Sequence, residues 1–157
     1  MGYLNDFFGS VRDLRWLEDG RGRLMEVLRN DPKPDGLGGV VGLDFGQAYV
    51  TTCRPGVVKA WHHHTRQTDR MVCLSGDLQI GLYSEALGRV ATVFSTDRNP
   101  RLVTILPGIW HGFSSVGTTE AIVLNIPDRA YDYQSPDEQR RPAHDKSIPY
   151  KWGVTDE

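Results

Sequence analysis

Residues 55–76 read PGVVKAWHHHTRQTDRMVCLSG, and this stretch predicts two β-strands joined by a polar turn. One apolar run begins at Val57 and ends in three successive histidines, and a second run covers 71–74. The turn-forming residues 54–56 precede the first run, and 75–77 follow the second. Short apolar runs between such turns are typical of strands rather than helices.

The same pattern continues outward from this stretch. Other short apolar or alternating runs are 45–53, 78–83, 91–94, 102–106 and 121–126. Turn clusters separate them at about the spacing of a β-sandwich or barrel. We therefore predict one all-β domain over residues 1–157, a jelly-roll β-barrel whose core spans about 40–127.

The two ends of the chain differ from this core. In the first 30 residues, leucines alternate with charged residues and a DGRG interruption divides them, which predicts two short helical elements. From Pro127 the chain is polar and rich in proline, and we expect an irregular C-terminal tail. The tail should pack across the barrel, because it carries aromatic side chains that are costly to leave in water: Tyr131, Tyr133, Tyr150 and Trp152.

Composition narrows the classes of function. The chain is 39% hydrophobic and 24% charged, values typical of a soluble globular domain. Its net charge of −2 provides no broad cationic field, so we expect neither a nucleic-acid nor a membrane partner. The sequence lacks a membrane-spanning apolar stretch and a signal-peptide pattern, which predicts a cytoplasmic protein. Cys53 and Cys73 have no disulfide or CxxC spacing and are expected to be buried free thiols.

Four of the five histidines fall in two places, at 62–64 and at 111. Side chains alternate along a strand, so His62 and His64 share one face and His63 points away with Trp61. Together with Asp69 and His111, the first pair offers donors that suit a divalent transition metal.

The same four residues can also function without a metal. His64 and Asp69 would then hydrogen-bond to each other, while His62 and His111 do acid–base or binding work. The short Asp side chain and the cationic neighbours favour an organic anion, and we expect no metal and no cofactor.

The histidine spacing resembles a known signature. Gly56-x5-His62-x-His64-x4-Asp69-x6-Gly76, followed by PGxxH at 107–111, resembles the two-part motif of the cupin superfamily, with Asp69 where Glu is usual. This resemblance implies a cupin-type jelly roll whose site lies in the mouth of the barrel.

A more specific resemblance covers nearly the whole chain. Residues 45–62, FGQAYVTTCRPGVVKAWH, resemble the F-x-Q and PGV-(R/K)-x-x-H strands of dTDP-4-dehydrorhamnose 3,5-epimerases. Residues 19–26 resemble the family's D-x-RG-x-F-x-E element, 106–113 its IP-x-G-x-AHGF strand, and 131–138 its Y-x-P-x-x-E segment. Four motifs in the family's order identify the chain as a member.

Membership implies a homodimeric isomerase that epimerises a nucleoside-diphosphate 4-keto-6-deoxy sugar next to its ketone. By motif position His62 is the catalytic base, and Arg70 replaces a lysine near the C4 oxygen, where its cation would stabilise an enolate. Lys59 matches the contact to the diphosphate. The other positions implied to bind substrate are Arg21, Glu26, Gln47, His64 and His111.

Two departures from the family pattern bear on the mechanism. Alignment on Ser135-Pro136 places Asp128 where the family has its tyrosine acid, so Tyr133 can serve as the acid only if the segment shifts. The chain also has no C-terminal S-x-K-D stretch, whose aspartate pairs with the base histidine in the family. Two alternatives therefore stay open. One is a metal-dependent cupin enzyme acting on a small molecule, and the other is a sugar-nucleotide binding protein without catalysis.

Overall fold

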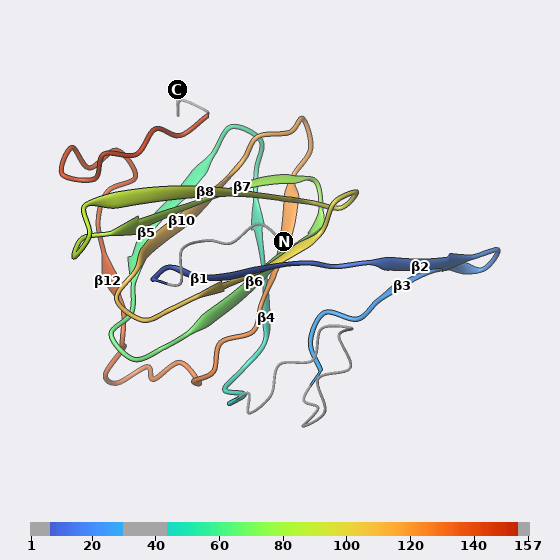
Figure 1. The fold of residues 1–157 in the computed structure, drawn as a ribbon, viewed down its shortest axis with the longest axis horizontal. Coiled ribbons are helices and arrows are strands. Elements are labelled where there is room, and N and C mark those ends of the chain that lie inside the picture. Colours follow the sequence, from blue (N-terminus) through green and yellow to red (C-terminus); the bar gives the residue numbers. More distant parts are fainter. Residues whose placement is uncertain (1–6, 30–43, 154–157) are drawn as a thin grey trace.

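The structure, a computed structural model, describes residues 7–29 and 44–153 and consists of strands and irregular segments (Figure 1). Its described part contains no helix, so none is long and apolar enough to cross a membrane. The all-β class predicted from the apolar runs is confirmed. The predicted start of the core, at about residue 40, lies outside the described residues.

Ten of the strands form two antiparallel sheets of five strands each. In spatial order, the first sheet contains β1 (Gly9–Asp13), β9 (Arg101–Ile105), β6 (Asp69–Ser75), β11 (Ala121–Asn125) and β4 (Tyr49–Cys53). The second sheet contains β12 (Gln139–Arg140), β5 (Val58–His63), β10 (Trp110–Ser115), β7 (Asp77–Ser84) and β8 (Arg89–Thr96).

The main core lies between these two sheets. It joins Val103 and Val123 of the first sheet to Leu78, Ile80 and Phe113 of the second, all of them buried. Each such side chain contributes about 1.5–3 kcal/mol when it leaves water. The alternation of apolar residues along the runs therefore sets which face of each strand points inward.

The predicted barrel does not close. Among the described residues, no ladder of backbone hydrogen bonds joins an edge strand of one sheet to an edge strand of the other. A closed barrel requires such a ladder. At the open edge a side chain crosses instead, because Lys59 Nζ of β5 lies 2.7 Å from Thr51 Oγ1 of β4. The molecule is thus a sandwich with an opening between β4 and β5.

The predicted N-terminal helical elements are wrong. The segment forms a hairpin of β2 (Trp16–Asp19) and β3 (Gly22–Met25), in which Leu17 pairs with Leu24. A tight turn decides this: Arg21 N donates to Asp19 Oδ1 at 2.9 Å, and Gly22 has φ 145°, a conformation that glycine adopts most readily. Each half is also too short to be a stable helix by itself. The hairpin projects away from the two sheets (Figure 1).

The C-terminal tail covers the outer face of the second sheet. It is irregular except for β12, and it packs Ile148, Tyr150 and Trp152 against Trp61 and Trp110. The prediction of an irregular, packed tail is confirmed for these residues. It was wrong for Tyr133, which is 88% exposed because the loop that carries it turns outward. Cys53 and Cys73 are both buried and neither forms a disulfide, as predicted.

Candidate functional site

The candidate site lies at the open edge of the sandwich, where β4 faces β5. His62 of β5 pairs in register with His111 of β10, and their ring centroids are 6.2 Å apart. His63 points the other way. It lies against Trp110 on the outer face of the second sheet, where the tail packs, with 4.8 Å between ring centroids. The strand parity predicted from the sequence is therefore confirmed for this pair.

His62 has a carboxylate partner. Its Nδ1 lies 2.8 Å from Oε1 of Glu138, whose other oxygen accepts from Arg140 Nη2 at 2.8 Å. Short pairing of β12 with β5 brings the glutamate there, because Gln139 lies opposite His63. A carboxylate at Nδ1 holds the proton on that nitrogen and leaves Nε2 free to accept one.

The surroundings keep His62 neutral at physiological pH. Burial lowers the pKa of His62 below its ordinary value, and the Glu138 carboxylate opposes this effect without cancelling it. Burial by itself would raise the pKa of Glu138, but its hydrogen bonds to Arg140 and His62 lower it. The pair is therefore a neutral imidazole beside an ionised carboxylate, the state that a general base requires.

His64 and His111 share a second carboxylate. Asp69 Oδ2 lies 3.2 Å from His64 Nε2 and 3.0 Å from His111 Nε2. The other oxygen, Oδ1, accepts from Gln67 Nε2 at 2.9 Å and from Asn125 Nδ2 at 3.0 Å. Burial alone would raise the pKa of Asp69, but the hydrogen bonds from the two histidines hold it well below its usual range.

This cluster could hold a metal ion. Nδ1 of His64 contacts the carbonyl of Asp137, and Nδ1 of His111 lies 3.0 Å from the carbonyl of Ile109. Each Nδ1 therefore donates a proton, and each contact from Nε2 to Asp69 needs either a second proton or a cation between the two atoms. The ligand atoms of His64, Asp69 and His111 all lie within 4.8 Å of one another. His62 is not a member of this group.

The first sheet provides the opposite wall. Asn125, fully buried in β11, donates from Nδ2 to the hydroxyl of Tyr49 at 2.8 Å. Its Oδ1 accepts from Arg70 N at 3.0 Å. The Arg70 guanidinium is buried near the carbonyls of Asp44 and Ile126, each 3.4 Å from Nη1. Burial lowers the pKa of Arg70, and nearby carboxylates oppose this.

Two other predicted residues lie on this edge. Lys59 Nζ donates to Thr51 Oγ1 and, at 3.2 Å, to the carbonyl of Thr52. Gln47 Oε1 accepts from the backbone of Tyr131 at 3.1 Å and so ties the segment before β4 to the tail.

Three predicted residues lie apart from His62 within one chain. Arg21, with a side chain 91% exposed, forms an ion pair with Asp19 in the turn of the projecting hairpin. Glu26, just after the hairpin, pairs with Arg29 at 2.8 Å. Tyr133 packs its ring edge-on against Tyr131 in the solvent-exposed tail, with 4.9 Å between centroids.

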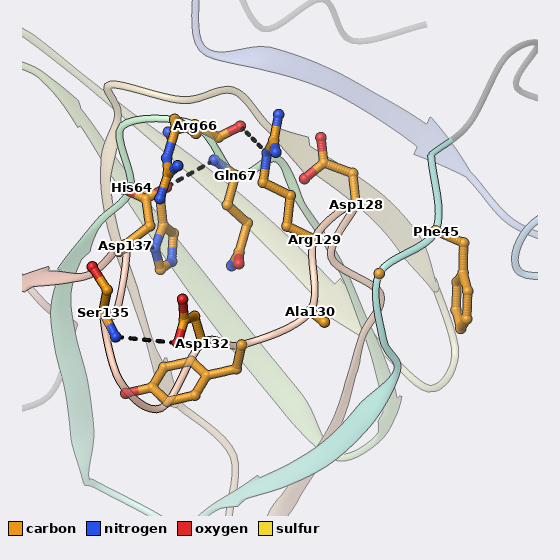
Figure 2. Close-up of a pocket in the computed structure, with 12 residues that line it drawn as sticks. Phe45, His64, Arg66, Gln67, Asp128, Arg129, Ala130, Asp132, Ser135 and Asp137 are labelled. Carbon is orange, nitrogen blue, oxygen red and sulfur yellow. Dashed lines mark hydrogen bonds and ion pairs between the residues drawn. The ribbon is translucent and has the colours of Figure 1, made fainter.

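A pocket of about 510 Å³ adjoins the site on the tail side (Figure 2). It includes His64 and Asp137 but not His62. Arg66 and Arg129 line it as cations, and Arg129 Nε donates to the Arg66 carbonyl at 3.2 Å. Asp128, Asp132 and Asp137 also line it, so its wall is polar and carries charges of both signs.

Comparison with known families identifies the fold. Residues 17–139 match the model of the polysaccharide biosynthesis C-terminal domain. The chain belongs to this family.

Two similar proteins are named as a sugar epimerase or isomerase. The probable low-salt glycan biosynthesis epimerase Agl13 of Haloferax volcanii is 36% identical over 151 residues, which is 92% of this chain and 93% of that protein. The dTDP sugar isomerase of Desulfovibrio desulfuricans G20 is 28% identical, with a TM-score of 0.79 over 95% of this chain and 94% of that one.

The predicted resemblance to dTDP-4-dehydrorhamnose 3,5-epimerases is confirmed for the fold. The enzyme of that name from Bacillus anthracis has the same fold, with a TM-score of 0.80 at 20% identity over 97% of this chain and 89% of that one. The predicted enzyme class, an isomerase of the sugar-epimerase type, is confirmed by these relatives.

Sequence reasoning missed three residues of this family member's site. Glu138 ends the segment 131–138 that resembles Y-x-P-x-x-E, but nothing in the sequence indicated its contact with His62. Tyr49 and Asn125 were counted only as strand residues. A signal for Tyr49 was available, since it stands two positions after Gln47 and alternation puts both on one strand face.

Proposed function

We propose that this protein epimerises a nucleoside-diphosphate 4-keto-6-deoxy sugar by removing and returning a proton at a carbon next to the ketone. The observation that carries this proposal is the His62–Glu138 pair at the open edge of the sandwich, with 2.8 Å between Nδ1 and Oε1. A half-buried, neutral imidazole held by a carboxylate is suited to accept a proton from carbon.

The reaction would take place in two proton transfers. His62 Nε2 removes the proton from the carbon, and the electron pair of the C–H bond moves to the ketone oxygen to form an enolate. The sequence-derived assignment of the cation that would stabilise this negative charge is Arg70, whose guanidinium lies near the carbonyls of Asp44 and Ile126, on the face of β6 opposite Asp69. An acid on the opposite face then returns a proton to the carbon, and the ketone re-forms with inverted configuration. The sequence-derived assignment of this acid is Tyr133.

The substrate would extend from this centre in both directions. His111 and His64 would line the sugar, and Lys59, on the same edge, would contact the diphosphate. Gln47 would face the nucleotide beside the tail. The 510 Å³ pocket next to His64 has room for a further part of the substrate, with two arginines on its wall.

Arg21 and Glu26 support the proposal of a homodimer. Both belong to the hairpin region, which projects from the sheets, and Leu17 and Leu24 on that hairpin are 61% and 62% exposed. A second copy would cover these leucines and receive Arg21 beside its own nucleotide. Sedimentation of the wild type and of a Leu17→Asp, Leu24→Asp variant would test this, with a monomeric variant as the expected result.

Solvent-deuterium exchange tests the proposed function directly. We would incubate the protein in D2O with thymidine and uridine diphosphate 4-keto-6-deoxyglucose and follow the protons next to the ketone by NMR. The expected result is deuterium incorporation together with a product of inverted configuration. Tight binding of either nucleotide without any exchange would contradict catalysis and favour a binding protein.

A metal-dependent enzyme is the second candidate, because the contacts of Asp69 Oδ2 with the Nε2 atoms of His64 and His111 are also those of a metal site. Metal analysis of the purified protein, followed by chelation and restoration with Zn²⁺ or Mn²⁺, separates the two functions. Epimerisation by proton transfer alone predicts that exchange survives chelation. Stoichiometric metal, with activity lost on chelation and regained on restoration, would establish the second candidate instead.

A further inference from the structure

We propose that Tyr49 is the catalytic acid of the epimerisation and delivers its hydroxyl proton to the face of the sugar opposite His62. The inference rests on the proposed function and assigns the acid that the family position, here Asp128, does not provide. Asp128 uses its carboxylate to accept the backbone N–H of Thr68 at 2.9 Å.

The chain places Tyr49 and His62 on facing walls. A turn in which Val57 N bonds the Arg54 carbonyl at 3.1 Å reverses the chain between β4 and β5. The contact of Lys59 Nζ with Thr51 Oγ1 at 2.7 Å then fixes which residues face each other. Two positions back along β4 from Thr51 is Tyr49. The pairing of β5 with β10 shifts register, so that Lys59 lies opposite Phe113 and His62 opposite His111, and the three residues from Lys59 to His62 span two positions of the ladder. Tyr49 and His62 are therefore each two positions from the Lys59–Thr51 contact, on opposite sheets.

The placement on two sheets suits inversion. Tyr49 belongs to the first sheet and His62 to the second, so a sugar ring that enters the opening between β4 and β5 would have an acid on one side and a base on the other. Inversion requires the proton to leave from one face of the ring and to return to the other. Tyr49 is the tyrosine placed on the wall opposite His62, whereas Tyr133 is 88% exposed in the tail.

The hydrogen bonds around Tyr49 leave its proton free. Asn125 Oδ1 accepts from Arg70 N at 3.0 Å, so the amide nitrogen must face the tyrosine, to whose oxygen it donates at 2.8 Å. The same nitrogen donates to Asp69 Oδ1 at 3.0 Å, which fixes the amide in place. The Tyr49 oxygen is thus an acceptor in this contact, and its own hydrogen can point into the opening.

The local charges keep Tyr49 protonated before the transfer. Burial raises the pKa of Tyr49, the hydrogen bond from Asn125 lowers it in part, and the carboxylates of Asp69 and Glu138 raise it again. When the O–H bond breaks and the new C–H bond forms, Asn125 continues to donate to the phenolate. The proton that His62 has taken up then returns to the phenolate through solvent, so the cycle ends with no net proton change.

Tyr49→Phe tests this assignment, because loss of the acid should affect formation of the inverted product much more than deuterium exchange. His62 still removes the proton and can return deuterium to the same face, so exchange with retained configuration should persist within about threefold of wild type. Formation of the inverted product should fall about 10²- to 10⁴-fold, the usual contribution of a positioned acid. Phenylalanine keeps the ring, and an unchanged melting temperature verifies the fold.

Tyr133→Phe is the matched comparison, since it removes the hydroxyl of the rival acid. Inversion lost in Tyr133→Phe and kept in Tyr49→Phe would overturn the proposal. Equal losses of exchange and inversion in Tyr49→Phe would also overturn it, because the residue would then act on both steps rather than as the acid. Absence of exchange in the wild type contradicts the proposed function itself and is thereby distinguished from failure of this assignment.

Discussion

Glu138 places Oε1 2.8 Å from Nδ1 of His62, although 76 residues separate them in the chain. The two-residue strand β12 brings the glutamate to the end of β5, next to the opening of the sandwich. The resemblance placed the carboxylate partner of the proposed base in a different motif. In this structure Glu138 makes the contact with His62.

Replacing Glu138 should change both the rate and its pH dependence. The base acts when His62 is neutral, and burial puts the pKa of His62 below its ordinary value, so activity should fall with acid only below that value. Glu138 raises this pKa, so Glu138→Gln should shift the acid limb to still lower pH. It should also slow exchange about 10- to 100-fold, because the ring is oriented less well.

The measurement for Glu138→Gln is the pH profile of kcat/KM for deuterium exchange. Glu85→Gln is the control, because Glu85 is also paired with an arginine, Arg141, but lies at the outer face. An acid limb that stays at the wild-type pH would show that Glu138 does not act on His62.

Substitution of single histidines should separate their roles. His62→Asn should abolish deuterium exchange while leaving nucleotide affinity nearly unchanged, because a base acts mainly in the transition state. His64→Asn should reduce exchange much less, and His63→Asn, on the outer face, should have wild-type exchange. NMR and calorimetry on the three variants provide the data. Equal loss in His62→Asn and His64→Asn, together with loss of bound metal, would identify the two as metal ligands.

Lys59 is expected to contribute to substrate affinity. Lys59→Ala should weaken binding of a nucleoside diphosphate by about 1.5–3 kcal/mol, the contribution of a hydrogen bond to a charged group. Lys146→Ala, at an exposed position of the tail, should bind as wild type. Calorimetry at one fixed salt concentration measures the nucleoside-diphosphate affinity of both variants. If the two affinities are equal, Lys59 contributes only its contact with β4 and does not bind the diphosphate.

Asp69 is expected to stabilise the fold. Asp69→Asn should lower the free energy of unfolding by about 3–5 kcal/mol, because it removes one partner of a buried charged cluster. Asp13→Asn breaks an exposed pair with Arg101 and should cost less than about 1 kcal/mol. Urea unfolding at pH 7 measures both.

Acid should reduce the difference between Asp69→Asn and the wild type. The pKa of Asp69 is lowered in the folded state, so its carboxylate stabilises the protein above the unfolded value, about 4, and this stabilisation is lost as pH falls further. A difference that stays constant from pH 7 to pH 3 would show that the charge contributes nothing.

Local sequence patterns were sufficient for the strands of the sandwich and for part of the site. Apolar runs bounded by turn residues predicted the strands from β4 to β9 and β11, because a pleated strand with one buried face requires that alternation. Parity along β5 correctly separated His63 from His62. The leucines of the N-terminal hairpin led to the wrong prediction of helices, because their spacing fits one face of a helix. The turn at 19–22 favours a hairpin instead.

The sequence by itself determined the strand faces, the histidine cluster and the family, because these depend on neighbours within a few residues and on motif order. Only the tertiary structure decided which other distant groups meet: Glu138 with His62, and Asn125 with Tyr49. These contacts depend on the register of strand pairs and on the open edge between two sheets. Register and sheet closure are set by backbone hydrogen bonds between segments remote in sequence, which no local pattern of side chains encodes.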